Sequence, residues 1–240
     1  KRRYTESIIL KQANSINHLS IILDGNKRWA KNNNLQVIDA YNAGIDNVLK
    51  ISDKLIEKKI KYFSVFTLST ENLKRKSVKI IFNSIFDRFY DFLEKIVNEK
   101  LIKIIVIGER HDLPSKLKEL IIETENKTIN NKKLTLILAF NYGFKKELIS
   151  AFKKGFEQVR LKNDINIENL DLNKFFYLGD IPDPDILIRT GGYKRLSNYL
   201  MYNLCYTELF FTETLWPDFN EIELKNIIHN FEQIKRNYGL

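Results

Sequence analysis

Short apolar segments alternate with longer stretches of helical periodicity along this 240-residue chain, and no other feature constrains the fold as strongly. Apolar residues recur at helical spacing over residues 39–59, 78–97, 116–126, 145–160 and 221–236. Strands separated by helices pair in parallel, so the sequence predicts an α/β fold, a mostly parallel six-stranded sheet with helices on both faces. The predicted strands are residues 19–23, 62–68, 102–107, 134–140, 185–189 and 208–212.

Nothing in the sequence divides this sheet between two domains. There is no internal repeat and no shift in composition, so we expect one domain over residues 18–240, after a basic, amphipathic extension over residues 1–17. The apolar runs are far too short to span a bilayer, and the single cysteine excludes a disulfide framework. Because the chain begins with lysine, a targeting segment before residue 1 remains open as an interpretation.

The formal net charge of +9 suits nucleic acid, an anionic membrane surface or phosphorylated substrates, and charge alone does not choose among them. The choice depends on where the cations lie. Ligands of open parallel sheets bind beyond the carboxyl ends of the strands, so we look at the residues that follow each predicted strand.

The first strand is followed by Asp-Gly-Asn-Lys-Arg-Trp-Ala over residues 24–30. A carboxylate at a strand end, a glycine and two adjacent cations at a helix start suit a diphosphate with Mg²⁺. Asp24 can reach the metal, and Lys27 and Arg28 can neutralise phosphate. A capped turn with solvated cations explains these residues equally well.

Two other strands end in less decisive sequences. Ser-Thr-Glu-Asn-Leu-Lys-Arg over residues 69–75 is rich in hydrogen-bonding groups, but an ordinary helix cap explains most of it. Asn141-Tyr142-Gly143 by itself indicates a tight turn.

The segment over residues 189–198 favours binding over a solvated basic loop. It combines Arg189 and Arg195 with Gly191-Gly192 and several hydroxyl groups. Paired glycines let the backbone approach a phosphate, and arginine can hold it through two parallel hydrogen bonds. Glu208, on the sixth strand, offers a second carboxylate to a metal. The sequence has no GxxxxGK[ST] loop, no GxGxxG after a strand, no HExxH and no DDxxD.

In this order the motifs resemble those of the cis-prenyltransferases, the family of the undecaprenyl and dehydrodolichyl diphosphate synthases. The resemblance runs from His18 to the C-terminus. It rests on HxxxxLDGNKRWA from His18, STENxxR from Ser69, NYG from Asn141, DILIRTGG with RLSN from Asp185, and Glu208 with WPDF at residues 216–219.

The resemblance implies a Mg²⁺-dependent ditrans,polycis-polyprenyl diphosphate synthase. Such an enzyme adds several isopentenyl diphosphates to farnesyl or geranylgeranyl diphosphate, with a cis double bond at each step. Cations and Mg²⁺ would stabilise the charge that develops on the departing diphosphate. The resemblance also implies a homodimer, or a heteromer with a non-catalytic homologous subunit.

The same resemblance carries roles to individual positions. The positions that match catalytic residues are Asp24, Asn26, Ser69 and Asn72, and those that match metal ligands are Asp24 and Glu208. The positions that match substrate-binding residues are Gly25, Lys27, Arg28, Trp29, Glu71, Arg75, Arg189, Arg195 and Ser197. Of these, Gly25, Arg28 and Arg75, with Asn26, would serve the allylic diphosphate. Arg189, Arg195 and Ser197 would serve isopentenyl diphosphate.

Several positions depart from the family's pattern. Val37 and Tyr41 lie where the family has an arginine and a Gly-His pair, which puts one contact to the allylic diphosphate in doubt. Tyr193 stands where the family often has glutamate. Asn237 replaces the arginine of a C-terminal RxG, for which Arg236 is the candidate substitute. The principal residues are present, so we expect an active enzyme.

The growing hydrocarbon requires an apolar wall. The helix predicted over residues 78–97 carries four phenylalanines, which either line a tunnel or belong to the ordinary core. Ile45 and Leu134 are further candidates for the wall. The segment over residues 183–189 and Leu113–Pro114 favour dehydrodolichyl diphosphate, for dolichol and protein glycosylation, as the product.

Two other functions are less consistent with the sequence. A non-catalytic partner subunit would lack the DGN and SxEN segments, and a nucleic-acid site would have basic faces without interspersed carboxylates. A long polyprenyl product has to leave into a bilayer. We therefore expect peripheral membrane contact through Lys1, Arg2, Arg3 and Lys11. The location would be the cytosolic face of the endoplasmic reticulum, or an organelle if a removed segment directed the chain there.

Overall fold

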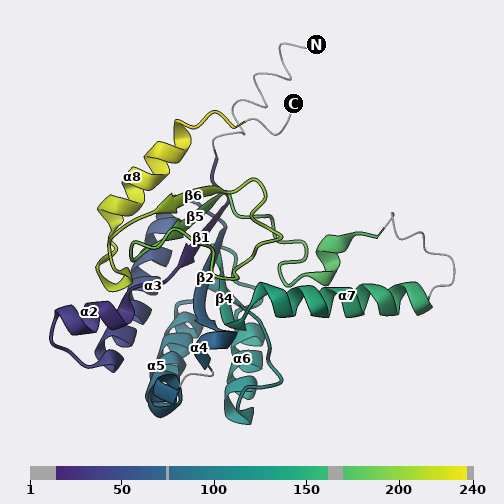
Figure 1. The fold of residues 1–240 in the computed structure, drawn as a ribbon, viewed down its shortest axis with the longest axis horizontal. Helices are drawn as coiled ribbons and strands as arrows, with labels where there is room; N and C mark the ends of the chain where they lie inside the picture. Colours follow the sequence, from purple (N-terminus) through teal and green to yellow (C-terminus); the bar gives the residue numbers. More distant parts are fainter. Residues whose placement is uncertain (1–14, 74–75, 162–169, 237–240) are drawn as a thin grey trace.

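The structure is a computed structural model that describes residues 15–73, 76–161 and 170–236. Most of the extension expected over residues 1–17 lies outside these residues. Six strands form one sheet in the order β3-β4-β2-β1-β5-β6, and every neighbouring pair is parallel (Figure 1). The predicted parallel sheet is therefore confirmed. The strands are β1 (His18–Ile22), β2 (Tyr62–Ser69), β3 (Ile102–Ile107), β4 (Leu134–Tyr142), β5 (Ile186–Arg189) and β6 (Glu208–Phe211).

Each predicted strand overlaps an observed one, because buried parallel strands are continuous apolar runs that are easy to locate. The helix predicted over residues 221–236 ends earlier, at Glu232, and the chain then turns so that Arg236 reaches Asp185. The helices are α2 (Asn26–Asn32), α3 (Val37–Glu57), α4 (Thr70–Leu73), α5 (Lys76–Glu99), α6 (Ser115–Thr128), α7 (Phe144–Leu161) and α8 (Glu221–Glu232). Two short 3-10 helices are η2 (Leu172–Phe175) and η3 (Trp216–Asp218).

Helices α3, α5, α6 and α8 cover one face of the sheet, where their apolar stripes form the main core with alternate strand residues such as Ile21, Val65 and Ile188. The opposite face, which includes Ile22 and Leu187, packs mainly against irregular segments over residues 177–181 and 196–204. Helix α7 extends away from that side (Figure 1). The two faces are thus covered unequally.

A chain of buried polar side chains crosses the second face. His18 places Nδ1 2.6 Å from the Pro182 carbonyl and Nε2 2.9 Å from Ser64 Oγ. Ser64 donates to Ser20, and Ser20 donates to the hydroxyl of Tyr199. His18 lies at the amino-terminal end of β1, so this motif residue organises the fold away from the carboxyl edge. Within the described residues, no helix has the length and apolar character needed to cross a bilayer.

Candidate active site

Asp24 lies two residues past β1, and its backbone is fixed from two sides. Its N–H donates to Thr190 Oγ1 at 3.0 Å, and its carbonyl accepts hydrogen bonds from Thr190 Oγ1 at 2.8 Å and from the Trp216 N–H at 3.0 Å. The end of β5 and the start of η3 thereby hold Asp24 at the carboxyl edge of the sheet, where the sequence predicted it.

The carboxylate of Asp24 joins two arginines. Its Oδ2 forms an ion pair with Arg189 Nη2 at 2.8 Å, and its Oδ1 forms an ion pair with Arg28 Nη2 at 3.3 Å. Arg189 is only 3% exposed, and it also donates to Ser197 Oγ at 2.6 Å and to the Arg195 carbonyl at 2.5 Å. A buried guanidinium needs such partners, because an unpaired charge is costly in the interior. The predicted diphosphate-binding residues of β1 and β5 are thus brought together.

The glycines of this cluster are required by close contacts. Gly191 and Gly192 have φ angles of 82° and 81°, which side chains rarely adopt. A Cβ at Gly191 would lie 2.5 Å from Arg28 Nη2 and 3.0 Å from the Asp24 carbonyl oxygen. The loop therefore lies directly against the Asp24–Arg28 pair.

A second polar cluster connects the ends of β2, β4 and β5. Asn198 Nδ2 donates to Glu71 Oε1 at 3.2 Å, and Asn198 Oδ1 accepts from the Lys145 N–H at 2.9 Å. Burial raises the pKa of the Glu71 carboxyl, but hydrogen bonds from its own backbone and from Ser69, Asn198 and Thr70 lower it below its ordinary value. Glu71 and Ser69 therefore lie next to the basic segment over residues 189–198. The side chain of Asn72 and all of Arg75 lie outside the described residues.

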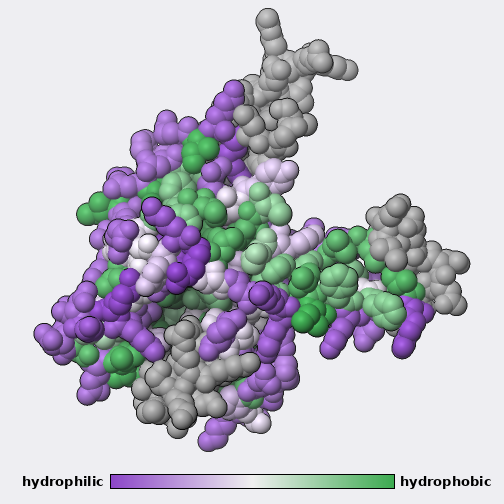
Figure 2. Space-filling view, in the orientation of Figure 1, coloured by the Kyte–Doolittle hydropathy of each residue, from purple (hydrophilic) through white to green (hydrophobic). Residues whose placement is uncertain are grey.

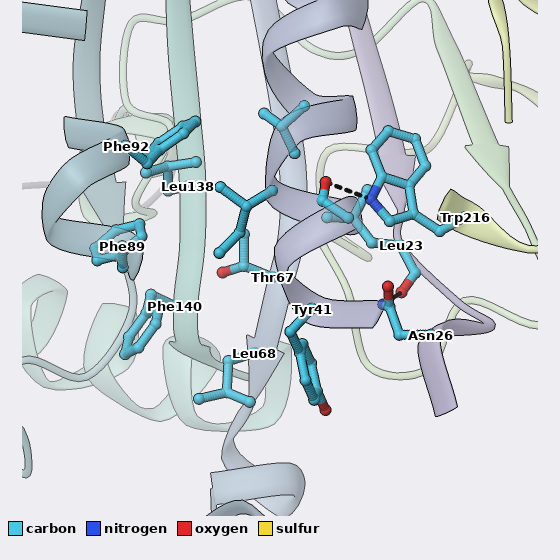
Figure 3. Close-up of a pocket in the computed structure, with 13 residues that line it drawn as sticks. Leu23, Asn26, Tyr41, Thr67, Leu68, Phe89, Phe92, Leu138, Phe140 and Trp216 are labelled. Carbon is cyan, nitrogen blue, oxygen red and sulfur yellow. Dashed lines mark hydrogen bonds between the residues drawn. The ribbon is translucent and has the colours of Figure 1, made fainter. Parts of the chain in front are cut away.

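An apolar pocket opens beside the first cluster, between α3, α5 and the sheet (Figure 3). The cavity itself has a volume of about 90 Å³, and the wider space, with the open solvent at its mouth, is about 750 Å³. Figure 3 shows Asn26 and Trp216 on one side and Phe89, Phe92 and Phe140 on the other. The residues that line it are Leu23, Asn26, Tyr41, Gly44, Ile45, Val48, Thr67, Leu68, Phe89, Phe92, Leu138, Phe140 and Trp216.

The predicted wall is partly confirmed. Phe89, Phe92 and Ile45 line the pocket, whereas the placement of Leu134 was wrong. Leu134 is the first residue of β4 and is buried in the main core, because the pocket forms at the opposite end of that strand. The side chains of the other two phenylalanines lie outside the described part of α5.

Asn26 connects the charged cluster with the pocket. It follows Gly25, whose φ of 115° turns the chain from Asp24 into α2. Its amide Nδ2 donates to the Leu23 carbonyl at 3.3 Å, while its Oδ1 is buried and has no hydrogen-bond partner in the structure. Trp216, on the same side of the pocket, donates from Nε1 to the Gly44 carbonyl at 2.9 Å (Figure 3). A bound ligand with a polar head group and an apolar tail would therefore have the junction between the two at Asn26.

The role of Glu208 as a metal ligand stays a prediction, and within this chain Glu208 lies away from Asp24. Glu208 begins β6 and pairs with Ile186, whereas Phe211 pairs with Arg189. At roughly 3.3 Å per residue, Glu208 lies about 10 Å back along the strand from the Arg189 level. Glu213 is the carboxylate that reaches the site from β6, since a Cβ on Gly192 would lie 2.4 Å from its Oε2. The rule that ligands bind beyond the carboxyl ends of the strands would have selected Glu213, which follows β6.

Among the described residues, no three His, Cys, Asp or Glu side chains gather to hold a metal. Mg²⁺ is usually held by one or two carboxylates together with substrate phosphates. The side chain of Asp24 is 27% exposed at the sheet edge, so its donor chemistry fits such an ion together with a bound diphosphate.

Two further positions have structural partners. Trp29 Nε1 donates to Asp218 Oδ1 at 2.6 Å, which ties α2 to η3. Arg236 forms a 3.0 Å ion pair with Asp185 of its own chain, and its role as the substitute for the cation of the RxG motif stays a prediction. Lys27 is exposed in the first turn of α2, and Asn237 lies outside the described residues.

Comparison with known proteins agrees with this geometry. A family model described as "Putative undecaprenyl diphosphate synthase" matches residues 22–239. A tritrans,polycis-undecaprenyl-diphosphate synthase (geranylgeranyl-diphosphate specific) of Sulfurisphaera tokodaii is 38% identical over 230 residues, covering 92% of this chain and 87% of its own. A farnesyl-diphosphate-specific ditrans,polycis-undecaprenyl-diphosphate synthase of Micrococcus luteus is 34% identical and covers 100% and 97%. Lavandulyl diphosphate synthase from Lavandula x intermedia, solved with dimethylallyl diphosphate, superposes with a TM-score of 0.85 at 29% identity and covers 95% and 99%.

Proposed function

Because the chain belongs to the undecaprenyl diphosphate synthase family of cis-prenyltransferases, we propose that it condenses several isopentenyl diphosphates onto farnesyl or geranylgeranyl diphosphate. The product is a long-chain cis-polyprenyl diphosphate. One observation carries this proposal: the arginine cluster around Asp24 and the apolar pocket meet at Asn26. A ligand with a diphosphate head and a hydrocarbon tail matches both halves.

The arginines bind and orient the two diphosphates. Arg189 is preorganised by Asp24 and Ser197, so little rearrangement is needed when a phosphate arrives. Arg28 stands on the α2 side of the cluster and is the cation for the allylic diphosphate. Arg195 and Ser197 serve isopentenyl diphosphate. The cluster acts most strongly on the transition state, where negative charge builds up on the departing diphosphate.

Asp24 would hold Mg²⁺ together with phosphate oxygens, and the ion would add further charge stabilisation for the leaving group. Asp24 also sets the distance between Arg28 and Arg189, since each of its oxygens binds one of them. The apolar pocket takes the allylic tail and excludes water from its reactive end.

The length of the product is the finer part of the proposal. The pocket begins at the Asn26 side and reaches the phenylalanines of α5, so these rings stand in the path of an elongating tail. We retain dehydrodolichyl diphosphate as the product, on the sequence of residues 183–189 and Leu113–Pro114. Because some relatives are named undecaprenyl diphosphate synthases, a shorter polyprenyl diphosphate is the competing outcome.

A dimer is supported by the exposed face of α7. Phe152 and Phe156 are 73% and 72% exposed, and they border an apolar groove that also includes Leu172 and Tyr202. Figure 2 shows this apolar surface along the projecting helix. Exposed patches of this kind mark interaction sites, so we assign the face to a second copy of the chain, with a homologous subunit as the alternative. Membrane contact through residues 1–17, on the cytosolic side of the endoplasmic reticulum or in an organelle, belongs to the same proposal.

The experiment is turnover by the purified chain alone. Labelled isopentenyl diphosphate is supplied with Mg²⁺ and with either farnesyl or geranylgeranyl diphosphate, and the products are separated by length after dephosphorylation. Incorporation into long polyprenols that depends on the primer supports the proposal. No incorporation by a folded, dimeric chain would show that it is a non-catalytic subunit, and a single addition would exclude the polyprenyl product.

A further inference from the structure

The aromatic ring of Tyr193 lies among three arginines of the charged cluster around Asp24. The guanidinium carbon of Arg195 lies 4.1 Å from the centre of the Tyr193 ring, that of Arg28 lies 4.9 Å away, and that of Arg189 lies 5.8 Å away. All three distances fall within the roughly 6 Å range of cation–π attraction. Tyr193 therefore contacts cations assigned to both diphosphates.

The backbone holds the ring in this position. Tyr193 directly follows Gly191 and Gly192, whose left-handed conformations fold the loop back over Asp24 and Arg28. Gly191 and Gly192 also donate backbone hydrogen bonds of 2.8 Å to the carbonyls of Thr214 and Thr212. The ring itself is 45% exposed, so burial in a core does not explain its position.

The three arginines differ in what else they contact. Arg189 and Arg28 pair with Asp24 at 2.8 and 3.3 Å. In the part of the chain that the structure describes, Arg195 forms no salt bridge, and its guanidinium is placed by the Tyr193 ring. Without the ring, Arg195 would be a long exposed side chain with free rotamers and two like charges nearby.

An aromatic face is better suited than a carboxylate to position these arginines for phosphate binding. A cation over the ring is attracted to the π face, whereas the N–H donors of arginine lie in the plane of the guanidinium and point outward from its edges. A carboxylate would occupy those donors and would cancel one positive charge. The ring orders the cations without cancelling their charge and without occupying any of their donors.

We propose that Tyr193 is a positioning residue for both diphosphates, because its ring contacts Arg28 and Arg195 without occupying their N–H donors. This inference rests on the proposed function for the identity of the substrates. It goes beyond that function by making one side chain, which acts only through the arginines, a determinant of affinity for both substrates.

The test compares Tyr193→Phe and Tyr193→Trp, which keep an aromatic face, with Tyr193→Leu, which keeps an apolar side chain without one. Binding of inorganic diphosphate is measured by calorimetry at two salt concentrations, and KM and kcat are measured for isopentenyl and allylic diphosphates. We expect Tyr193→Phe and Tyr193→Trp to bind within about twofold of the parent. We expect Tyr193→Leu to bind about five- to tenfold more weakly, as loss of two exposed cation–π contacts would give.

Tyr193→Leu raises KM for both substrates by a similar factor and changes kcat by less than about threefold, since the ring acts through binding cations. Equal binding and KM in Tyr193→Leu and the parent would overturn the proposal. So would tighter binding, which would mean that the ring blocks the site, or an equal loss in Tyr193→Phe, which would assign the effect to the hydroxyl. If the parent binds diphosphate but makes no polyprenol, the proposed function fails while the binding comparison still tests Tyr193.

Discussion

Asp24 and Arg189 form a salt bridge of 2.8 Å although 165 positions separate them in the sequence. Neighbouring parallel strands β1 and β5 make this contact possible, because Ile22 pairs in register with Arg189 and Asp24 follows two residues later. The pair is the centre of the charged cluster. Its partners, Arg28 and Ser197, extend the cluster to the positions that we propose for the two diphosphates.

The first prediction concerns this pair. Asp24→Asn keeps the size of the side chain, removes its charge and leaves the buried Arg189 without an anionic partner. We expect kcat/KM to fall by at least about 100-fold, the usual effect of removing one preorganised electrostatic group. Steady-state kinetics with labelled isopentenyl diphosphate measure this directly.

A matched control is available elsewhere in the sheet. Asp185→Asn removes the carboxylate that forms the 3.0 Å ion pair with Arg236, another largely buried arginine, at the amino-terminal end of β5. Both variants should lose stability, by up to about 3–5 kcal/mol, because each leaves an uncompensated buried charge. Only Asp24→Asn should lose activity in the fraction that remains folded. Similar losses of activity in both variants would mean that the Asp24 effect is one of folding.

The second prediction concerns Gly44 in α3. A Cβ at this position would lie 2.7 Å from Asn26 Oδ1 and 3.0 Å from Trp216 Cδ1. Gly44→Ala must therefore displace Asn26 from the junction between the charged cluster and the pocket. We expect a loss of kcat of about tenfold or more, since small misplacement at a reacting centre is costly.

Gly155 in α7 provides the comparison. A Cβ there would meet the Phe175 ring at 3.6 Å, an ordinary contact. Gly155→Ala should stabilise the helix by about 0.5–1 kcal/mol and leave kcat unchanged. If Gly44→Ala behaves like Gly155→Ala in both respects, the position of Asn26 does not matter for turnover.

The charged cluster could be predicted from sequence because it depends on strand ends. Residues directly after parallel strands converge at one edge, so Asp24 and Arg189 were identified without knowledge of register. Glu208 stands at the beginning of its strand, so this rule does not select it, and its role as a metal ligand rests on the resemblance alone. The rule applies to the residue that follows a strand, and Glu213 meets that condition more nearly.

The details that depend on side-chain packing could not be predicted. Helical periodicity places Phe89 and Phe92 on the inner face of α5, but it does not tell a core contact from a pocket wall. The contacts of Tyr193 depend on a loop folded by two left-handed glycines, which no periodicity records. Such contacts are set by tertiary geometry alone.

The third prediction concerns the length of the product. Phe92 lies on α5 and lines the pocket, and its side chain is only 5% exposed. Phe92→Leu enlarges the space for the growing tail, so the distribution of polyprenols should shift to longer chains. The measurement is chromatography of the dephosphorylated products.

Phe231→Leu is the control for general loosening of the core. Phe231 is 1% exposed on α8 and does not line the pocket. Both substitutions should destabilise the fold by about 1–3 kcal/mol, but only Phe92→Leu should change the products. An identical product distribution in the parent and both variants would remove Phe92 from the path of the tail.

The last prediction follows from His18, which is completely buried. Burial lowers its pKa from 6.5 to about 4, and the Pro182 carbonyl and Asp185 only partly oppose this shift. Between these two values the unfolded chain takes up a proton that the folded protein excludes, so stability is full above about pH 6.5 and falls as the pH approaches 4. Between pH 7.5 and pH 5.0 this residue should cost about 2 kcal/mol.

Urea unfolding of the parent, His18→Asn and His229→Asn at the two pH values isolates this contribution. His18→Asn should be less stable than the parent at pH 7.5, because it loses the hydrogen bond to Pro182 or Ser64, but its stability should depend less on pH by about 2 kcal/mol. His229 is exposed on α8, so His229→Asn should keep the parental pH dependence. If His18→Asn keeps it as well, a different group is responsible for the loss of stability in acid.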